Sequence, residues 1–473
     1  MMIFMRSKGL LTLLFLFYFF NDLAAPQSIV ETLPGYSGTL PFKLETGYVS
    51  VGEIDDVQFF YYLIESEGDP VTDPLMLWLT GGPGCSAFSG LVYEIGPLTF
   101  DFEAFDGSLP SFLLNPYSWT KLANIIFLDA PVGTGFSYAT TYEGYHSTDV
   151  KTVEDIYTFL QKWLLKHPKF IKNRLYIAGD SYAGILVPMI VYKISEGIEA
   201  GIKPRMNIQG YVIGNPGADT RIDGNSVVPF AHRLGLISDK YYKMAKINCH
   251  EEYVNPDPEN AWCLYALQFY KECIKNIFKA NVLEPACKFR SSKPEDLESG
   301  NTHLEDDSDI RILPRSNGKE SWCRNDNYVL SYVWANDLAV QEALHIRKGT
   351  IEEWIRCNKS LSYDETVESV VQYHQLLSKK GYEALVYSGD HDMVVPYIGT
   401  LKWIRLLNLT IDDDWRPWIV DAQVAGYTER YTYDKTQSHL IFATVKGAGH
   451  TAPEYKPKQC FVMLERFFES YPL

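Results

Sequence analysis

The amino-acid sequence predicts an α/β fold, with a mostly parallel central sheet flanked by helices and a helical, disulfide-bearing insertion. In the N-terminal half, short apolar runs alternate with helical patterns such as residues 149–166, where apolar side chains recur at helical spacing. Strands that alternate with helices indicate a parallel-rich sheet covered on both faces. After residue 213 the strand signals become sparse, and they return near residue 384. The predicted strands are residues 59–64, 75–79, 125–128, 175–178, 208–213, 384–387 and 439–445.

The stretch from about residue 225 to residue 335 is expected to be an insertion within a single domain that spans residues 26–473. It has helical patterns, few strand signals and five of the eight cysteines. Within it, residues 291–319 are rich in Ser, Asp, Glu, Arg and Gly, a composition typical of an exposed linker. The composition fits a linker that is excised and equally a loop that stays in place.

The first 25 residues have the order of features found in a signal peptide. Arg6 and Lys8 precede an apolar run over residues 10–20, and the small residues Ala24 and Ala25 follow. The run is eleven residues long, well below the roughly 20 that cross a bilayer as a helix. We therefore expect cleavage near Ala25, no membrane attachment afterwards, and a destination in the vacuole or outside the cell.

Composition limits the classes of partner and cofactor that we expect. The formal net charge of −16 argues against nucleic acid or an anionic membrane as a partner. Eight cysteines in an exported chain are expected to be mostly bridged. Sequons at Asn358 and Asn408 predict glycosylation on the same route. The sequence contains no Cys-x-x-Cys pair and no His-rich cluster, so we expect neither a metal nor a cofactor.

Residues 179–184, Gly-Asp-Ser-Tyr-Ala-Gly, carry the clearest local sign of chemistry. They follow a predicted strand and open a helical run over residues 185–194, the strand–turn–helix context of a nucleophile elbow. Such a tight turn needs small residues two before and two after the serine, and Gly179 and Ala183 meet that need. The helix N-terminus would also face the negative charge that develops when a hydroxyl attacks. Ser181 is therefore the predicted nucleophile.

A serine nucleophile needs a base and an acid that orients the base, and in an α/β-hydrolase they follow in the order Ser, Asp or Glu, His. Asp392 and His450 lie just past the last two predicted strands, at the sheet edge where such folds keep their chemistry. Asp390 and His391 compete for the two roles. Chain order and the glycine-rich approach favour His450 as the base, and the spacing favours Asp392 as the acid.

Residues 80–86, Thr-Gly-Gly-Pro-Gly-Cys-Ser, follow another predicted strand. Glycines let the backbone approach a substrate and aim its N–H groups there, and glycine-rich loops at this place in the chain form oxyanion holes in esterases. We expect the backbone amides of Gly82 and Tyr182 to form that hole. A tight turn next to a structural disulfide at Cys85 would explain the same glycines, and the two interpretations are compatible.

Five segments occur in order along the chain, namely residues 78–86, 129–137, 179–184, 388–392 and 449–450. Together they resemble the serine carboxypeptidase family over nearly the whole chain after residue 25. The resemblance implies an α/β-hydrolase fold with a helical insertion, and it assigns the acid to the second aspartate of Gly-Asp-x-Asp, Asp392. It also implies three disulfides, namely Cys85–Cys323, Cys249–Cys263 and Cys273–Cys287.

The chain departs from the peptidases of this family where they hold the terminal carboxylate of the substrate. Those enzymes use an asparagine before the two glycines, a glutamate before the serine and a second, paired glutamate; this chain has Thr80, Asp180 and Glu94 there. Thr80 cannot supply the amide donor of asparagine. Since two carboxyls in one site do not both ionise easily, Asp180 and Glu94 are expected to share a proton, and one pKa should rise. With Gly81, these three are the predicted substrate-binding residues.

Threonine before the two glycines and the sequence Gly-Asp-Ser-Tyr resemble the plant-type acyltransferase branch of the family. That resemblance implies transfer of an acyl group from a 1-O-β-glucose ester to a hydroxyl acceptor. Two alternatives stay open: a serine-type carboxypeptidase that acts on peptide C-termini at acidic pH, and a secreted binding protein on an inactive hydrolase fold.

Overall fold

The computed structural model describes residues 28–286, 323–433 and 438–473. The predicted signal peptide, the predicted linker at 291–319 and Cys287 lie outside these residues. The described strands form a twelve-stranded sheet and two small two-stranded sheets. Six neighbouring strands of the large sheet run parallel, and the outer strands pair in antiparallel fashion. The predicted α/β fold with a mostly parallel sheet is therefore confirmed.

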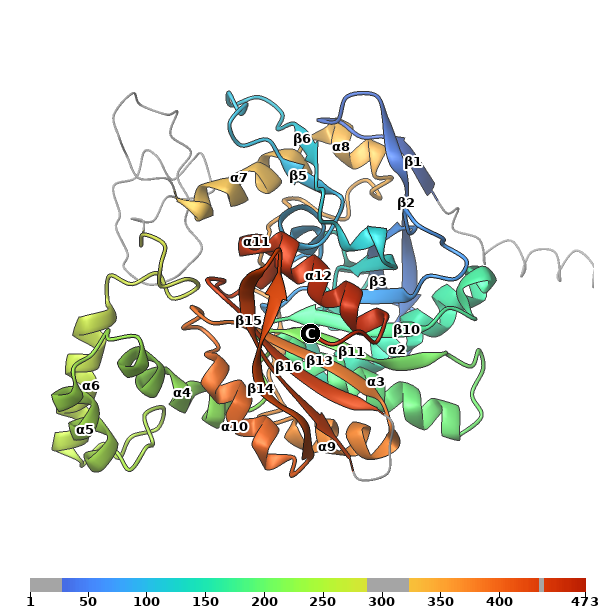
Figure 1. Cartoon of the computed structure of the whole chain (residues 1–473). Helices are drawn as coiled ribbons and strands as arrows, with labels where there is room; N and C mark the ends of the chain where they lie inside the picture. The colour runs from blue at the N-terminus through green and yellow to red at the C-terminus, as the bar shows by residue number, and fades with distance from the viewer. Residues whose placement is uncertain (1–27, 287–322, 434–437) are drawn as a thin grey trace, which may run out of the picture.

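The large sheet crosses the middle of the molecule (Figure 1). Its order is β1-β2-β3-β7-β4-β10-β11-β13-β16-β15-β14, and β8 pairs with β3 off this path. The six parallel strands run from β7 to β16 in this order. The strands are β1 (Ser28–Thr32), β2 (Thr39–Val51), β3 (Val57–Ile64), β4 (Leu75–Leu79), β7 (Asn124–Leu128), β8 (Tyr138–Ala139), β10 (Leu175–Asp180), β11 (Ile208–Gly214), β13 (Glu383–Gly389), β14 (Thr410–Val420), β15 (Gln423–Thr432) and β16 (His439–Val445). The small sheets pair β5 (Leu98–Phe100) with β6 (Phe112–Leu114), and β9 (Ser147–Thr148) with β12 (Tyr363–Asp364).

The central strands are apolar throughout because both of their faces are covered. In β4 all five residues are buried. Leu75 and Leu77 join one apolar cluster, whereas Met76 and Trp78 join the other. This period of two follows from the pleat, which points successive side chains to opposite faces. A slip of one residue would exchange the two faces, so burial sets the register that places the loop after each strand.

Two groups of helices cover the two faces. One apolar cluster packs the sheet against α2 (Asp149–Lys166), α3 (Ala183–Glu199), α9 (Val371–Lys380) and α10 (Tyr397–Leu406). The other cluster packs it against α7 (Arg324–Ala335), α8 (Leu338–Ala343), α11 (Ala452–Tyr455) and α12 (Pro457–Phe468). α2 begins where Thr148 caps it through the Lys151 N–H, at 3.2 Å. Its Phe159 and Trp163 are fully buried, which explains the helical spacing of its apolar residues.

The chain between β11 and β12 is helical in its described parts. It forms α4 (Thr220–Arg233), α5 (Asp239–Asn248) and α6 (Ala261–Ile274) before residue 287, and α7 and α8 after residue 322. Figure 1 shows α5 and α6 standing to one side of the sheet, at the lower left, while α7 and α8 lie along the top of the molecule in this view. α4, α5 and α6 bury a small apolar cluster of their own, which also takes in Met393 from the loop after β13.

One disulfide occurs as expected and two do not. Cys249 pairs with Cys263 and joins α5 to α6. Cys85 pairs with Cys357 and not with Cys323, which is bonded elsewhere. The physical reason is a short antiparallel contact: the Ser86 N–H donates to Arg356 O at 2.7 Å, and the Asn358 N–H donates to Gly84 O at 2.9 Å. The predicted Cys273–Cys287 bridge is also wrong, because the Cys273 thiol is free on the exposed end of α6.

The two sequons lie in different surroundings. Asn408 is exposed at the end of α10. Asn358 is half-buried beside Cys357, and its side-chain amide donates to Gly133 O at 3.0 Å. Of the two, Asn408 offers the freer acceptor for a glycan. Among the described helices, none is both long and apolar enough to cross a membrane.

Candidate active site

Ser181 lies at a sharp turn between β10 and α3, with a φ of +54°. This left-handed backbone is strained for a residue with a side chain and is typical of a nucleophile elbow. A Cβ on Gly179 would lie 2.4 Å from Leu79 O and 2.7 Å from the Ala183 Cβ. Glycine at 179 is therefore a steric requirement of the turn, as the sequence pattern predicts.

His450 lies on the loop after β16 and reaches the serine. Its Nε2 is 2.8 Å from the Ser181 Oγ, and its Nδ1 is 2.8 Å from the Asp392 Oδ2. Its backbone N–H donates to Ala280 O at 2.7 Å. The structure thus brings Ser181, His450 and Asp392 together in the order that the sequence predicts. Because the Nδ1–H donates to the carboxylate, the neutral ring leaves Nε2 unprotonated and able to accept the serine proton.

Asp392 is fully buried and held on both oxygens. Its Oδ1 accepts the Val394 N–H at 2.7 Å, and its Oδ2 accepts the Asn215 side-chain amide at 2.8 Å as well as His450. Sequence reasoning missed Asn215, which directly follows β11, on the same kind of loop after a strand that carries Asp392 and His450. A search for polar residues after every predicted strand would have included it. Asn215 thus holds the same carboxylate oxygen that His450 contacts.

Asp390 and His391, the other candidates for the acid and the base, pair with each other. Asp390 Oδ1 is 2.6 Å from His391 Nδ1 and also accepts the Gly447 N–H at 2.6 Å. Asp390 therefore ties the loop after β13 to the loop that carries His450. Its role in the fold is to join two loops, and it makes no contact with the serine.

The pKa of His450 is raised above that of a free imidazole. Burial alone lowers it, but the charge of Asp392, its hydrogen bond and the nearby Asp180 together outweigh burial. The site therefore stabilises the imidazolium that forms when His450 takes the serine proton.

The glycine-rich loop lies against the nucleophile. A Cβ on Gly81 would lie 2.5 Å from the Ser181 Cβ, so only glycine fits there. The Gly82 φ is +131°. Within residues 28–286, 323–433 and 438–473, neither the Gly82 N–H nor the Tyr182 N–H donates to a protein acceptor. Both predicted oxyanion donors thus stay open to a ligand.

Asp129 anchors this loop from beneath. Its Oδ1 accepts the Ser86 hydroxyl at 2.6 Å and the Ala87 N–H at 2.9 Å, and its Oδ2 accepts the Phe136 N–H at 2.9 Å. Burial raises the pKa of Asp129 to about 6. The motif 129–137 therefore supports the glycine loop, a role that its residue types do not disclose.

Asp149, also missed by sequence reasoning, anchors the residue after the nucleophile. It is fully buried and accepts the Tyr182 hydroxyl at 2.6 Å and the Tyr363 hydroxyl at 2.8 Å. The Thr366 and Val367 N–H groups donate to its other oxygen. Tyr182 is thereby held from its side chain, which leaves its backbone amide at a fixed place beside Ser181.

Asp180 and Glu94 form the buried carboxyl pair that the sequence predicts. Asp180 Oδ1 accepts the Gly81 N–H at 3.1 Å, and Glu94 is the last residue of the short π-helix Gly90–Glu94. The pKa of Glu94 is raised well above its ordinary value, first by burial and then by the charge of Asp180. Burial also raises the pKa of Asp180, although His450 and the Gly81 N–H offset part of that. Thr80 accepts the Trp78 indole N–H at 3.2 Å.

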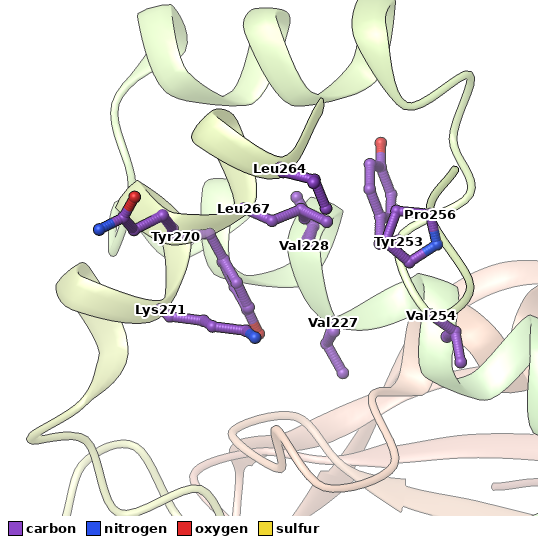
Figure 2. Close-up of a pocket in the computed structure, with 10 residues that line it drawn as sticks. Val227, Val228, Tyr253, Val254, Pro256, Leu264, Leu267, Tyr270 and Lys271 are labelled. Atoms are coloured by element: carbon purple, nitrogen blue, oxygen red, sulfur yellow. The ribbon is translucent and has the colours of Figure 1, made fainter. Parts of the chain in front are cut away.

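A pocket of about 290 Å³ lies among the insertion helices, between α4, α6 and the loop at residues 253–256 (Figure 2). Apolar side chains such as Val228 and Leu267 line it, and Lys271 lies at its edge. It contains none of the predicted site residues. Over the described ranges, no group of three or more His, Cys, Asp or Glu residues could hold a metal ion.

A solved structure supports the assignment of the fold. Kex1(delta)p, a prohormone-processing carboxypeptidase from Saccharomyces cerevisiae, superposes with a TM-score of 0.73 at 20% identity, over 94% of this chain and 95% of that one. At this identity the likeness concerns architecture alone. Together with the elbow at Ser181 and the parallel sheet, it places the chain in the α/β-hydrolase class.

Sequence comparison gives the family. The serine carboxypeptidase model matches residues 34–470. Serine carboxypeptidase-like 17 of Arabidopsis thaliana is 45% identical over 446 residues, 94% of each chain, and serine carboxypeptidase-like 1 is 46% identical over 466 residues, 98% of each. The chain belongs to the serine carboxypeptidase family.

Proposed function

We propose that this enzyme transfers an acyl group from a 1-O-β-glucose ester to a hydroxyl acceptor through an acyl-enzyme on Ser181. The observation that carries the proposal is the hydrogen-bonded series from Ser181 through His450 to Asp392, with 2.8 Å at each step. A serine, a base and an orienting acid in this geometry are the parts that acyl transfer needs.

The reaction has two halves that use the same base. His450 takes the proton of Ser181 as the hydroxyl oxygen attacks the ester carbonyl, and the Gly82 and Tyr182 amides would hold the oxyanion. Collapse expels the glucose oxygen, which takes the proton from His450 and leaves as glucose. The acceptor hydroxyl then gives its proton to His450 and attacks the acyl-enzyme. Ser181 recovers its proton when the new ester leaves.

The surroundings of the carboxyl pair favour an ester donor over a peptide. Thr80 offers a hydroxyl where the family's peptidases offer an amide, and that hydroxyl already accepts the Trp78 N–H. Asp180 and Glu94 are carboxyls with raised pKa, so one proton between them leaves a donor and an acceptor side by side. Such a pair suits sugar hydroxyls, which both give and accept hydrogen bonds.

A serine-type carboxypeptidase is the second candidate. The same carboxyl pair favours it, because a protonated carboxyl can donate to the terminal carboxylate of a peptide at acidic pH. In that reaction water, in place of an acceptor hydroxyl, would attack the acyl-enzyme. An acidic compartment such as a vacuole, or the cell exterior, suits either reaction. The exposed sequon at Asn408 fits a chain that reaches such a compartment through the secretory pathway.

The test pairs the two substrate classes in one assay. The purified protein is incubated at about pH 5.5, where carboxyls begin to titrate, with a panel of 1-O-acyl glucoses and hydroxylated acceptors, and separately with a blocked dipeptide. A new ester that depends on Ser181 and forms without peptide cleavage supports the transferase. Release of the terminal amino acid instead makes the enzyme a carboxypeptidase.

The Ser181→Ala variant is the control for both assays. A fluorophosphonate probe, which labels activated serines irrespective of substrate, addresses the third interpretation. If folded wild-type protein takes up no label, the chain is a binding protein on an inactive hydrolase fold and the proposal is wrong.

A further inference from the structure

Residues 279–284, which we call the clamp segment, follow α6 after a short turn and lie between the loops that carry the acid and the base. The Met393 N–H donates to Lys279 O at 2.8 Å, next to Asp392 in the chain. The Val282 N–H donates to His391 O at 3.1 Å. On the other side, the His450 N–H donates to Ala280 O at 2.7 Å. Three backbone hydrogen bonds thus join one short segment to both loops.

The base loop is also packed on this segment. A Cβ on Gly449 would lie 2.2 Å from Ala280 O and 2.7 Å from the Asn281 Cβ, so the residue before His450 is in close contact with the clamp segment. Asn281 is itself buried, with 3% of its surface exposed. On the acid side, Met393 is buried in the small apolar cluster of the insertion, against which Val282 packs. Backbone bonds and packing therefore act at the same two loops.

Arg324, the first residue of α7, fastens the far end of the clamp segment. Its guanidinium donates two hydrogen bonds to Glu284, at 2.6 Å and 3.0 Å, and a third to Glu454 at 3.2 Å. Glu454 lies in α11, four residues after His450, and its other oxygen accepts the Thr451 and Tyr328 hydroxyls. The three charged side chains are 6–18% exposed, so solvent screens them little.

We propose that Arg324 is a positioning residue, which joins the clamp segment to α11 and so keeps His450 in line between Asp392 and Ser181. The proposal rests on the proposed function in so far as that function assigns acyl-enzyme formation to these three residues. Without the guanidinium, Glu284 and Glu454 would be two carboxylates on one site and would repel each other. The loop that carries His450 would then move away from the clamp segment. Small displacements of a base cost large factors in rate.

The test measures how fast a fluorophosphonate probe labels Ser181 across a range of pH, because labelling needs the base but no particular substrate. For Arg324→Gln we expect the plateau rate constant to fall by about tenfold or more, as for a displaced general base. The midpoint of the pH profile should fall as well, since the raised pKa of His450 depends on its contact with Asp392 and on nearby Asp180. A purely structural role for Arg324 would not move this midpoint.

Arg416→Gln is the matched control. It removes a comparable guanidinium–carboxylate pair, with Asp413 at 2.7 Å and 2.9 Å, on β14. Its labelling rate and midpoint should equal those of the wild type. Arg324→Lys keeps the charge but cannot donate two parallel hydrogen bonds to Glu284. Its labelling rate should lie between those of Arg324→Gln and the wild type.

The outcomes separate the two proposals. An Arg324→Gln variant that is labelled like the wild type, with the same midpoint, would overturn the positioning role and leave the proposed function intact. Equal losses in Arg324→Gln and Arg416→Gln would overturn it too. If Arg324→Gln does not fold, Glu284→Gln, which keeps the shape and removes one charge, replaces it and carries the same expectation of a lower midpoint. Wild-type protein that takes no label would refute the proposed function and, with it, this inference.

Discussion

The edge of the central sheet and the helical insertion hold the same site by different means. At the sheet edge, Ser181, Asn215, Asp392 and His450 each lie on the loop after a buried parallel strand, and the packing of two apolar faces fixes those strands. The insertion has a small apolar cluster and a disulfide of its own, and it reaches the site through an ion-pair group and a few backbone bonds to neighbouring loops. The comparison teaches that the reacting groups depend on the core, whereas their fine alignment depends on contacts between distant segments.

The largest effect should come from the acid at the sheet edge. In Asp392→Asn the amide can no longer hold the correct tautomer of His450, and we expect turnover to fall by about 10⁴-fold. Circular dichroism should show a retained fold.

Asp390→Asn is the matched comparison two residues away. Asp390 contacts His391 and Gly447 and not His450, so turnover should change by less than about tenfold. Similar losses in the two variants would mean that the assignment of the acid is wrong.

The glycine loop should give the next effect. A Cβ in Gly81→Ala would meet the Ser181 Cβ at 2.5 Å and Asp180 O at 2.9 Å, so the loop must shift away from the nucleophile. Displacing one oxyanion donor costs roughly 10²–10³-fold in turnover, and we expect a loss of that order. Gly217→Ala is the control, because a Cβ there meets only Ser181 O, at 3.7 Å. A fully active Gly81→Ala enzyme would contradict the close contact between residue 81 and Ser181.

The disulfides compare the two regions directly. Cys85–Cys357 closes a loop of 272 residues at the glycine loop, and Cys249–Cys263 closes one of 14 in the insertion. Loop-closure entropy assigns them roughly 5.6 and about 3 kcal/mol of stability. The Cys85→Ala/Cys357→Ala variant should therefore unfold at lower urea than Cys249→Ala/Cys263→Ala. Equal urea midpoints would show that strain or residual structure in the unfolded chain, and not loop length, sets the contribution of each disulfide.

The smallest effect concerns the pH dependence of stability. Burial raises the pKa of Asp129 to about 6 and of Asp223 to about 7, and burial with Asp180 raises that of Glu94. The folded protein thus binds more protons than the unfolded chain between the ordinary carboxyl pKa and these values. Stability should rise as pH falls through this window, by on the order of 1 kcal/mol per carboxyl.

Melting temperatures at about pH 7 and about pH 5 test this sign. The wild type should melt higher at the acidic value. Glu94→Gln removes one of the titrating carboxyls and should make the dependence shallower. A wild type that melts at a lower temperature at about pH 5 would show that other titrating groups dominate the pH dependence of stability.

The sequence predicted what is local or follows from chain order. The strand before Ser181, the small residues around it and the order of acid and base are all readable within short segments, and the structure brings these residues together. The sheet was predictable because burial on both faces leaves a continuous apolar run in each strand.

Contacts between segments far apart in the chain were not predictable from sequence. The partner of Cys85 depends on a two-residue antiparallel contact with the chain at 356–358, which no composition or spacing records. The backbone carbonyls of the clamp segment carry no sequence signature at all. Asp129 stood in a recognised motif, yet its role under the glycine loop became visible only when Ser86 and Phe136 were placed around it.

The left-handed backbone at Ser181 has an evolutionary consequence. Glycine would adopt a φ of +54° freely, whereas serine in that conformation costs roughly 1 kcal/mol. Glycine at 181 would relieve this backbone strain, but it would also remove the hydroxyl that His450 contacts. Selection on stability alone would discard the serine, so its presence is the mark of selection for reactivity. A descendant that no longer needs a nucleophile should tolerate glycine there.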